Sequence, residues 1–158
     1  MTALTHRDKN TKLQIYSVLS QVLSDTFLLY VKTLNFHWNI VDPRFSSLHA
    51  LFEKQYEELA EANDEIAERM RALSLKAPGT LQQFQNLSTL EEDEGEFSGD
   101  QMIQLLYKDH ISLADQMRAS VDAVAKLGDD GTADLLIQRI RAHEKNAWML
   151  KSHLPQDL

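Results

Sequence analysis

The sequence contains no cysteine, which excludes a disulfide framework, a thiolate metal site and a cysteine nucleophile. Only five glycines and three prolines interrupt 158 residues, so we expect long regular elements with few turns, most simply helices. No apolar run approaches the roughly 18 residues that span a bilayer, and the polar start of the chain does not fit a secretory signal. These absences predict a cytoplasmic, mostly helical protein with no membrane partner. We expect one domain over residues 1–158, with a flexible tail at residues 1–10.

The chain also has fewer basic residues than acidic ones. The chain has 16 Lys and Arg against 24 Asp and Glu, a formal net charge of −8, which disfavours binding a polyanion such as DNA. A local basic arm could still bind DNA, and the clearest candidate is the start of the chain, where Arg7, Lys9 and Lys12 surround Asp8. A solvated chain end accounts for the same residues, so both interpretations stay open.

Apolar residues recur at spacings of three, four and seven along four segments, which is the pattern of amphipathic helices. The predicted helices cover about residues 11–39, 43–73, 98–128 and 129–154. Asp42 and Ser98 are candidate N-caps, and Gly128 is a candidate helix end.

The connection between the second and third helices is long, at about residues 74–97, and needs a structural reason. It contains an apolar-patterned piece at Leu81–Leu87, which predicts a brief helix, and the acidic run Glu91–Glu96, which we interpret as a solvated loop. In a bundle such a connection crosses from one end to the other, so that the helices on either side run parallel. The predicted fold class is all-α, a ferritin-like four-helix bundle with a long crossover between helices 2 and 3 containing a short helix.

Four side chains that can bind a metal share one face of the second predicted helix. With His49 placed at zero, Glu53 lies about 40° round the helix, Asp64 about 60° and Glu68 about 100°. Small residues, Ala60 and Ala67, lie between them on this face. Histidine and carboxylate ligands on one stripe suit iron, manganese or zinc.

Distance argues that one chain does not complete this site. His49 and Asp64 are fifteen residues apart, which is about 22 Å along a helix. His37, at the end of the first helix, can join His49 and Glu53 at one end, whereas Asp64 and Glu68 lie near the other. Two antiparallel copies related by a two-fold axis would bring these halves together twice.

Other interpretations of these residues stay open on spacing alone. Acidic residues are common in this chain, and we interpret four neighbours on the same helix as surface charges: Glu57, Glu58, Glu61 and Glu65. A lone histidine is more often structural than a ligand. The chain also lacks the Glu-x-x-His motif that normally supplies a di-iron site within one bundle.

The spacing of these ligands resembles the pattern of the Dps family, the DNA-binding proteins from starved cells. That pattern is His, eleven residues, His, three residues, an acid, ten residues, Asp, three residues, Glu, which here falls on His37, His49, Glu53, Asp64 and Glu68. Trp38, the Phe45–His49 segment, the Asp64–Arg69 block and Trp148–Leu150 also match, so the likeness covers essentially the whole chain.

The resemblance implies a hollow shell of twelve subunits built from dimers. The shell would take up Fe(II), oxidise it preferentially with hydrogen peroxide and store ferric mineral, with two irons at each site between subunits. Glu68 would bridge the irons, Asp64 and the partner's His37 would bind one, and His49 and Glu53 the other. The family usually has Asp where this chain has Glu53, which alters the second iron position. Trp38 would either intercept an oxidising radical or pack the interface.

The resemblance extends to the start of the fourth helix, where Asp130 and Asp134 match acidic positions that line the three-fold pores of the family. Both acids would equally favour a helix N-terminus. The family name also implies an alternative function, a nucleoid-associated protein that binds and compacts DNA. His6, His110 and His143 receive no role beyond core or surface packing.

Overall fold

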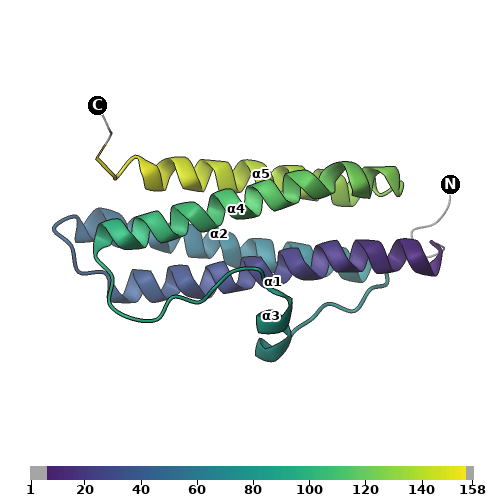
Figure 1. Ribbon diagram of the computed structural model, residues 1–158, viewed down its shortest axis with the longest axis horizontal. Helices are drawn as coiled ribbons and strands as arrows, with labels where there is room; N and C mark the ends of the chain where they lie inside the picture. The colour runs from purple at the N-terminus through teal and green to yellow at the C-terminus, as the bar shows by residue number, and fades with distance from the viewer. Residues whose placement is uncertain (1–6, 156–158) are drawn as a thin grey trace.

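The computed structural model describes residues 7–155 and confirms the predicted all-α, ferritin-like fold. The helices are α1 (Lys9–Asn39), α2 (Phe45–Ala72), α3 (Leu81–Leu87), α4 (Gly99–Lys126) and α5 (Asp130–Lys151), and no strand occurs in the described part of the chain. The four long helices lie side by side, with α1–α2 and α4–α5 forming two antiparallel hairpins, while α3 stands outside the bundle beside α1 (Figure 1). Among residues 7–155, no helix is long and apolar enough to cross a membrane.

The long crossover has the predicted form. It returns along the outside of the bundle from the end of α2 to the start of α4, so α2 and α4 run in the same direction (Figure 1). The short helix begins and ends at the predicted residues, and Thr80 caps it together with Gln83. Ser98 caps α4 as predicted, by accepting a hydrogen bond from the backbone N–H of Gln101.

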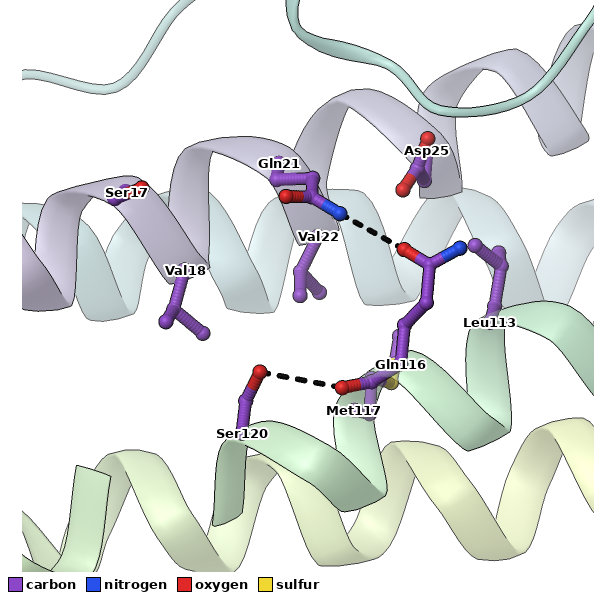
Figure 2. A pocket seen from close by; sticks show the side chains of 9 residues that line it. All are labelled: Ser17, Val18, Gln21, Val22, Asp25, Leu113, Gln116, Met117 and Ser120. Atoms are coloured by element: carbon purple, nitrogen blue, oxygen red, sulfur yellow. Dashed lines mark hydrogen bonds between the residues drawn. The ribbon is translucent and has the colours of Figure 1, made fainter. Parts of the chain in front are cut away.

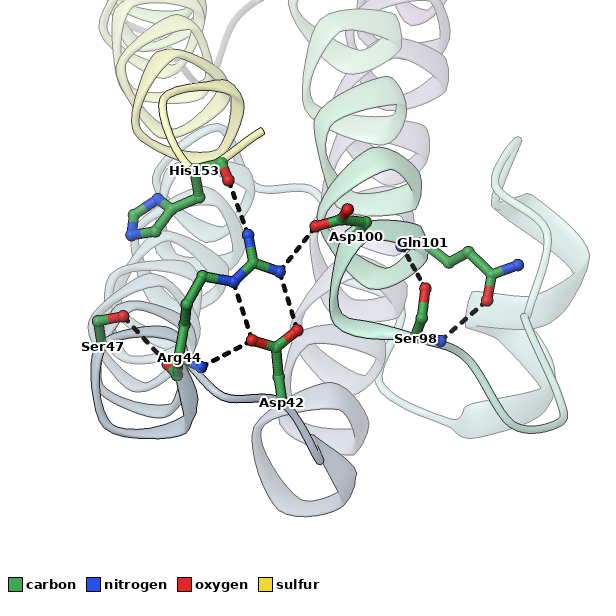
Figure 3. Close-up of polar contacts among 7 residues, drawn as sticks. All are labelled: Asp42, Arg44, Ser47, Ser98, Asp100, Gln101 and His153. Carbon is green, nitrogen blue, oxygen red and sulfur yellow. Dashed lines mark hydrogen bonds and ion pairs between the residues drawn. The ribbon is translucent and has the colours of Figure 1, made fainter. Parts of the chain in front are cut away.

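One predicted cap is wrong. The residue before α2 is Arg44, and the Asp42 carboxylate instead accepts hydrogen bonds from the backbone and guanidinium of Arg44 (Figure 3). These bonds lower the pKa of Asp42 to about 2. The same guanidinium reaches Asp100 at the start of α4 and the carbonyl of His153 after α5. Asp42 and Arg44 therefore join three helix ends rather than capping one.

The start of the chain differs from a free arm where it is described. The first helix begins at Lys9, and the Arg7 guanidinium donates to the carbonyl oxygens of Leu127 (3.1 Å) and Gly128 (2.8 Å) after α4. Residues 1–6, which make up most of the predicted tail and include His6, lie outside the described residues.

The crossover is fixed to the bundle by polar contacts. Asp25 of α1 is only 1% exposed and accepts hydrogen bonds from the Ser88 hydroxyl and from the backbone and hydroxyl of Thr89. Lys32 forms ion pairs of 2.6 Å with both Asp93 and Asp109. The acidic run is thus a solvated loop except at Asp93, which ties it to α1 and α4.

A small cavity of about 70 Å³ lies beside Asp25, between α1 and α4 (Figure 2). Gln21 donates a hydrogen bond of 2.8 Å to Gln116 across it. Its lining contains none of the predicted metal ligands, so this cavity is separate from the predicted site.

Candidate metal centre

His37 and His49 lie together although they belong to different helices. His37 is in the last turn of α1 and His49 in the second turn of α2, and the short connection at residues 40–44 brings the two turns side by side. Their imidazole rings stack, with centroids 3.7 Å apart and an interplanar angle of 16°. His37 is buried, and His49 is partly exposed. The structure therefore brings together two of the five predicted ligands.

Each imidazole is hydrogen-bonded to the backbone of the other histidine. Nδ1 of His37 is 2.8 Å from the carbonyl oxygen of His49, and Nδ1 of His49 is 2.9 Å from the carbonyl oxygen of His37. A carbonyl oxygen only accepts, so both Nδ1 atoms carry hydrogen and each neutral ring keeps its lone pair on Nε2. This is the arrangement that orients metal-binding histidines in proteins.

Two further rings flank the histidine pair. Phe45 stacks on His49, with centroids 4.8 Å apart and planes at 23°. Tyr56 meets His37 edge-on, at 5.1 Å and 75°. Loss of hydration raises the pKa of Tyr56, and the nearby Glu53 and Glu57 carboxylates raise it further, so the hydroxyl keeps its proton at neutral pH.

The three predicted carboxylate ligands are exposed along α2. Glu53 follows His49 by one turn, and Asp64 and Glu68 lie further along the same helix. Within the described residues none of the three takes part in a hydrogen bond or an ion pair. Glu58, which we interpreted as a surface charge, is instead half-buried and ion-paired with Arg139 of α5. The three predicted carboxylate ligands thus differ from Glu58 in having no hydrogen-bond or ion-pair partner among residues 7–155.

A single chain does not bring the five predicted metal ligands together. No group of three His, Asp or Glu side chains close enough to hold a metal occurs within residues 7–155. Asp64 stands about 22 Å along α2 from His49, so it cannot join the histidines of its own chain. Glu53, which was predicted to cluster with His37 and His49, does not form a metal-holding group with them either. A site with all five residues would need a second copy of the chain.

Trp38 is 68% exposed, although it directly follows the buried His37. Most of the large aromatic side chain directly after His37 in the sequence is therefore exposed to solvent. Its exposure fits both of the roles predicted for it, so the choice between them stays a prediction.

The predicted pore residues lie at the opposite end of the bundle. Asp130 is the first residue of α5, and Asp134 follows one turn later and accepts a hydrogen bond of 2.7 Å from Gln138. Both are exposed. The preceding residue, Asp129, lies where the sequence predicts the fourth helix to begin. It is buried, and its carboxylate caps α5 by accepting a hydrogen bond from the backbone N–H of Thr132. It also forms an ion pair with Arg69 of α2, and these long-range partners had no signal in the sequence.

His110 and His143 are both completely buried between α4 and α5, where packing was predicted. Their Nδ1 atoms form a hydrogen bond of 2.8 Å, and neither Nε2 has a hydrogen-bond partner. Burial, with a contribution from the positive charge of Arg139, lowers the pKa of His110 to about 3. Burial, aided by the charges of His110 and Arg139, lowers that of His143 as well. The pair is therefore neutral at physiological pH.

Comparison with known proteins identifies the class. Residues 17–157 match the ferritin-like domain family, so the chain belongs to the ferritin-like proteins. A low temperature-induced protein from Nostoc sp. is 42% identical over 89% of this chain and 79% of its own length. DNA protection during starvation protein 2 from Bacillus anthracis is 32% identical over 90% of this chain and 98% of its own.

The solved structures narrow the assignment. Dps from Thermosynechococcus elongatus superposes with a TM-score of 0.90 at 28% identity, covering 94% of both chains. Dps from Vibrio cholerae, described as a member of the ferritin-like diiron-carboxylate superfamily, gives a TM-score of 0.88 at 30% identity, covering 94% of this chain and 93% of its own. Within the ferritin-like class, the chain is a member of the Dps family.

Proposed function

We propose that this protein oxidises Fe(II) at sites shared between two subunits and stores the ferric product inside a cage, with hydrogen peroxide as the preferred oxidant. The observation that carries the proposal is the histidine pair. Both Nδ1 atoms donate to backbone carbonyls, which leaves two Nε2 lone pairs available for a metal. Membership of a family with a diiron-carboxylate relative supports iron as the metal.

A two-fold dimer completes the ligand set. His37, at the end of α1, lies beside the start of α2, where His49 and Glu53 are. Asp64 and Glu68 lie further along α2, with no hydrogen-bond or ion-pair partner in the described part of the chain. If two α2 helices pack antiparallel, the histidine end of each faces the acidic stretch of the other. The symmetry then creates two equal sites for each dimer. Twelve such subunits would form the closed shell expected for the family.

The proposed reaction balances with two Fe(II) ions for each peroxide. Two Fe(II) give up one electron each, and hydrogen peroxide takes both electrons and two protons to become two water molecules. Holding both ions at one site avoids one-electron reduction of peroxide, which would release hydroxyl radical. Neutral imidazoles and carboxylates suit Fe(II), and the negative carboxylates also stabilise the Fe(III) product.

The ligands would divide between the two iron positions. Glu68 of the partner subunit would bridge them, while Asp64 of the partner subunit and His37 would bind one ion. His49 and Glu53 would bind the other. Glu53 is one methylene longer than the aspartate usual in the family, so we expect this second position to be the weaker of the two. Asp130 and Asp134 would line the pore through which Fe(II) enters.

The test is anaerobic loading of the purified cage with Fe(II), followed by a stoichiometric pulse of hydrogen peroxide. Ferric absorbance and peroxide consumption would be recorded for the wild type and for a His37→Ala, His49→Ala double variant. We expect rapid oxidation at about two irons per peroxide in the wild type, and its loss in an intact variant cage. Equal rates in both cages would contradict the proposal.

Two adjacent acids offer a matched control for the carboxylate half. Asp64 and Glu65 are both exposed on α2, but they point about 100° apart round the helix. Asp64→Ala should slow oxidation at least tenfold, whereas Glu65→Ala should leave the rate unchanged. Similar losses in both variants would indicate a general effect of negative charge and not a ligand.

Protection of DNA follows from this chemistry without retention of DNA, because Fe(II) and peroxide are removed together. The structure gives the alternative of direct DNA binding little support. Arg7 of the basic arm already donates to the carbonyls of Leu127 and Gly128, and each subunit carries a net charge of −8. A salt-dependent gel shift with supercoiled DNA separates the two functions, and retention at physiological salt would favour the DNA-binding alternative.

A further inference from the structure

Four aromatic rings form a continuous row at the end of the bundle, in the order Phe45, His49, His37 and Tyr56. The first three are stacked, and Tyr56 meets His37 edge-on. Successive ring centroids are 4.8, 3.7 and 5.1 Å apart. The two imidazoles occupy the middle of this row, and Phe45 and Tyr56 form its outer walls. All four come from the last turn of α1 and the first half of α2.

The outer rings supply a constraint that the hydrogen bonds do not. The imidazole of a histidine turns easily about its last side-chain torsion, for which the energy wells are broad. A single bond from Nδ1 to a carbonyl oxygen fixes one point of the ring but still allows the ring to swing about it. A ring packed against the outer side of each imidazole, stacked on His49 and edge-on to His37, limits that swing and sets the direction of Nε2.

The exposure of Phe45 shows that this wall is not simply part of the core. The residue is 45% exposed, whereas Phe52 of the same helix is fully buried. Phe45 is the first residue of α2, one turn before His49, so the helix itself places its ring against the imidazole. A partly exposed phenyl ring that stacks on a candidate ligand is better explained by orientation of that ligand than by core packing.

We propose that Phe45 and Tyr56 are positioning residues that hold the imidazoles of His49 and His37 ready to bind a divalent cation. The inference rests on the proposed function, since it assumes that both Nε2 atoms bind metal. A ring that is already ordered loses less freedom on binding. Losing either wall should therefore weaken binding about three- to tenfold, which is the scale for ordering one side chain.

The experiment measures Co(II) binding to the assembled, iron-free cage, by titration and by the visible absorption of the bound ion. Phe45→Leu keeps an apolar side chain but removes the flat ring, and Phe45→Tyr keeps the ring. Tyr56→Leu and Tyr56→Phe form the same comparison at the other wall. Val41→Ala is the control, because Val41 is 88% exposed in the same connection. We expect weaker binding and an altered Co(II) spectrum in both leucine variants, with recovery in both aromatic variants.

The outcomes separate this inference from the proposed function. If His37→Ala, His49→Ala binds Co(II) as the wild type does, the proposed function fails. If that double variant loses binding while the leucine variants keep wild-type affinity and spectrum, the positioning role is overturned and the proposed function stands. Should Phe45→Leu not assemble, Phe45→Met replaces it, and the same two results decide the question.

Discussion

Gly99, the first residue of α4, leaves the space that the Asp42 carboxylate occupies. A Cβ atom at this position would overlap Asp42 Oδ2 and lie 2.8 Å from its Cγ. The carboxylate cannot easily move aside, because two nitrogens of the Arg44 guanidinium hold its two oxygens at 2.8 Å. The absence of one side chain thus allows the Asp42–Arg44 pair to join the helix ends (Figure 3).

Gly99→Ala should therefore destabilise the fold by about 1–3 kcal/mol, the usual cost of forcing extra volume into a packed place. The measurement is denaturant unfolding at fixed subunit concentration. Gly79→Ala is the matched control, because a Cβ there would meet nothing within 4 Å, and it should change stability by no more than about 0.5 kcal/mol. Equal effects of the two substitutions would show that Asp42 is free to move.

The buried histidines predict how stability depends on pH. The pKa of His110 falls from its ordinary 6.5 to about 3 on folding, so between these values the unfolded chain binds the proton and the folded chain does not. Stability is therefore complete above pH 6.5 and declines as pH falls towards 3. At pH 5 the loss from His110 alone is about 2 kcal/mol.

The double variant His110→Leu, His143→Leu should remove much of this acid dependence. Replacing both partners of a buried hydrogen bond with apolar side chains of similar size costs little, whereas His110→Leu alone leaves His143 Nδ1 unpaired and should cost about 1–3 kcal/mol. Unfolding free energies measured from pH 7.5 to 4.5 test both statements. A double variant as acid-sensitive as the wild type would locate the dependence in other groups.

At the scale of the helices, Asp25 is the main polar attachment of the crossover. Its carboxylate is 2.6 Å from both the Ser88 hydroxyl and the Thr89 backbone nitrogen. Asp25→Ala leaves these donors without an acceptor and should cost about 1–3 kcal/mol. Hydrogen exchange should quicken over residues 88–94 and stay unchanged in α5. Asp122→Ala, at an exposed position of α4, serves as the control, and unchanged exchange in Asp25→Ala would contradict the attachment.

The order and approximate bounds of the helices could be predicted because they depend on local signals. Apolar spacing and the Ser98 cap located α4, and the short helix at Leu81–Leu87 matched its predicted range. The wrong cap at Asp42 shows the limit. Its carboxylate bonds to an arginine that also reaches Asp100 and His153, and partners so distant in sequence leave no local pattern.

The candidate site, like the fold, could be predicted only in part from the sequence. Sequence spacing predicted that His37, His49 and Glu53 cluster. The structure stacks the two histidine rings, but within residues 7–155 Glu53 does not join them in a group close enough to hold a metal. The reciprocal bonds to backbone carbonyls could not be predicted, because they depend on how the end of α1 sits against α2. The carboxylate half stays a prediction, since it needs residues of a second copy.

At the scale of the assembly, a shared site has a consequence that a site within one chain lacks. A variant without His37 and His49 still has Asp64 and Glu68, and a variant without those acids still has both histidines. In a mixed dimer one site combines the two defective halves, but the other combines the two intact halves. Each variant cage should be inactive by itself, and co-assembly should create working sites.

Random pairing of equal amounts makes about half of the dimers mixed, each with one working site of two, so about a quarter of the wild-type oxidation rate should return. The measurement is the peroxide-driven Fe(II) oxidation rate of cages refolded from a mixture of the two variants. Mixing preformed cages without exchange of subunits is the control and should restore nothing. If co-assembled cages also stay inactive while their dimers are shown to be mixed, the ligands do not meet across the interface. Iron would then have to be oxidised at residues of a single chain.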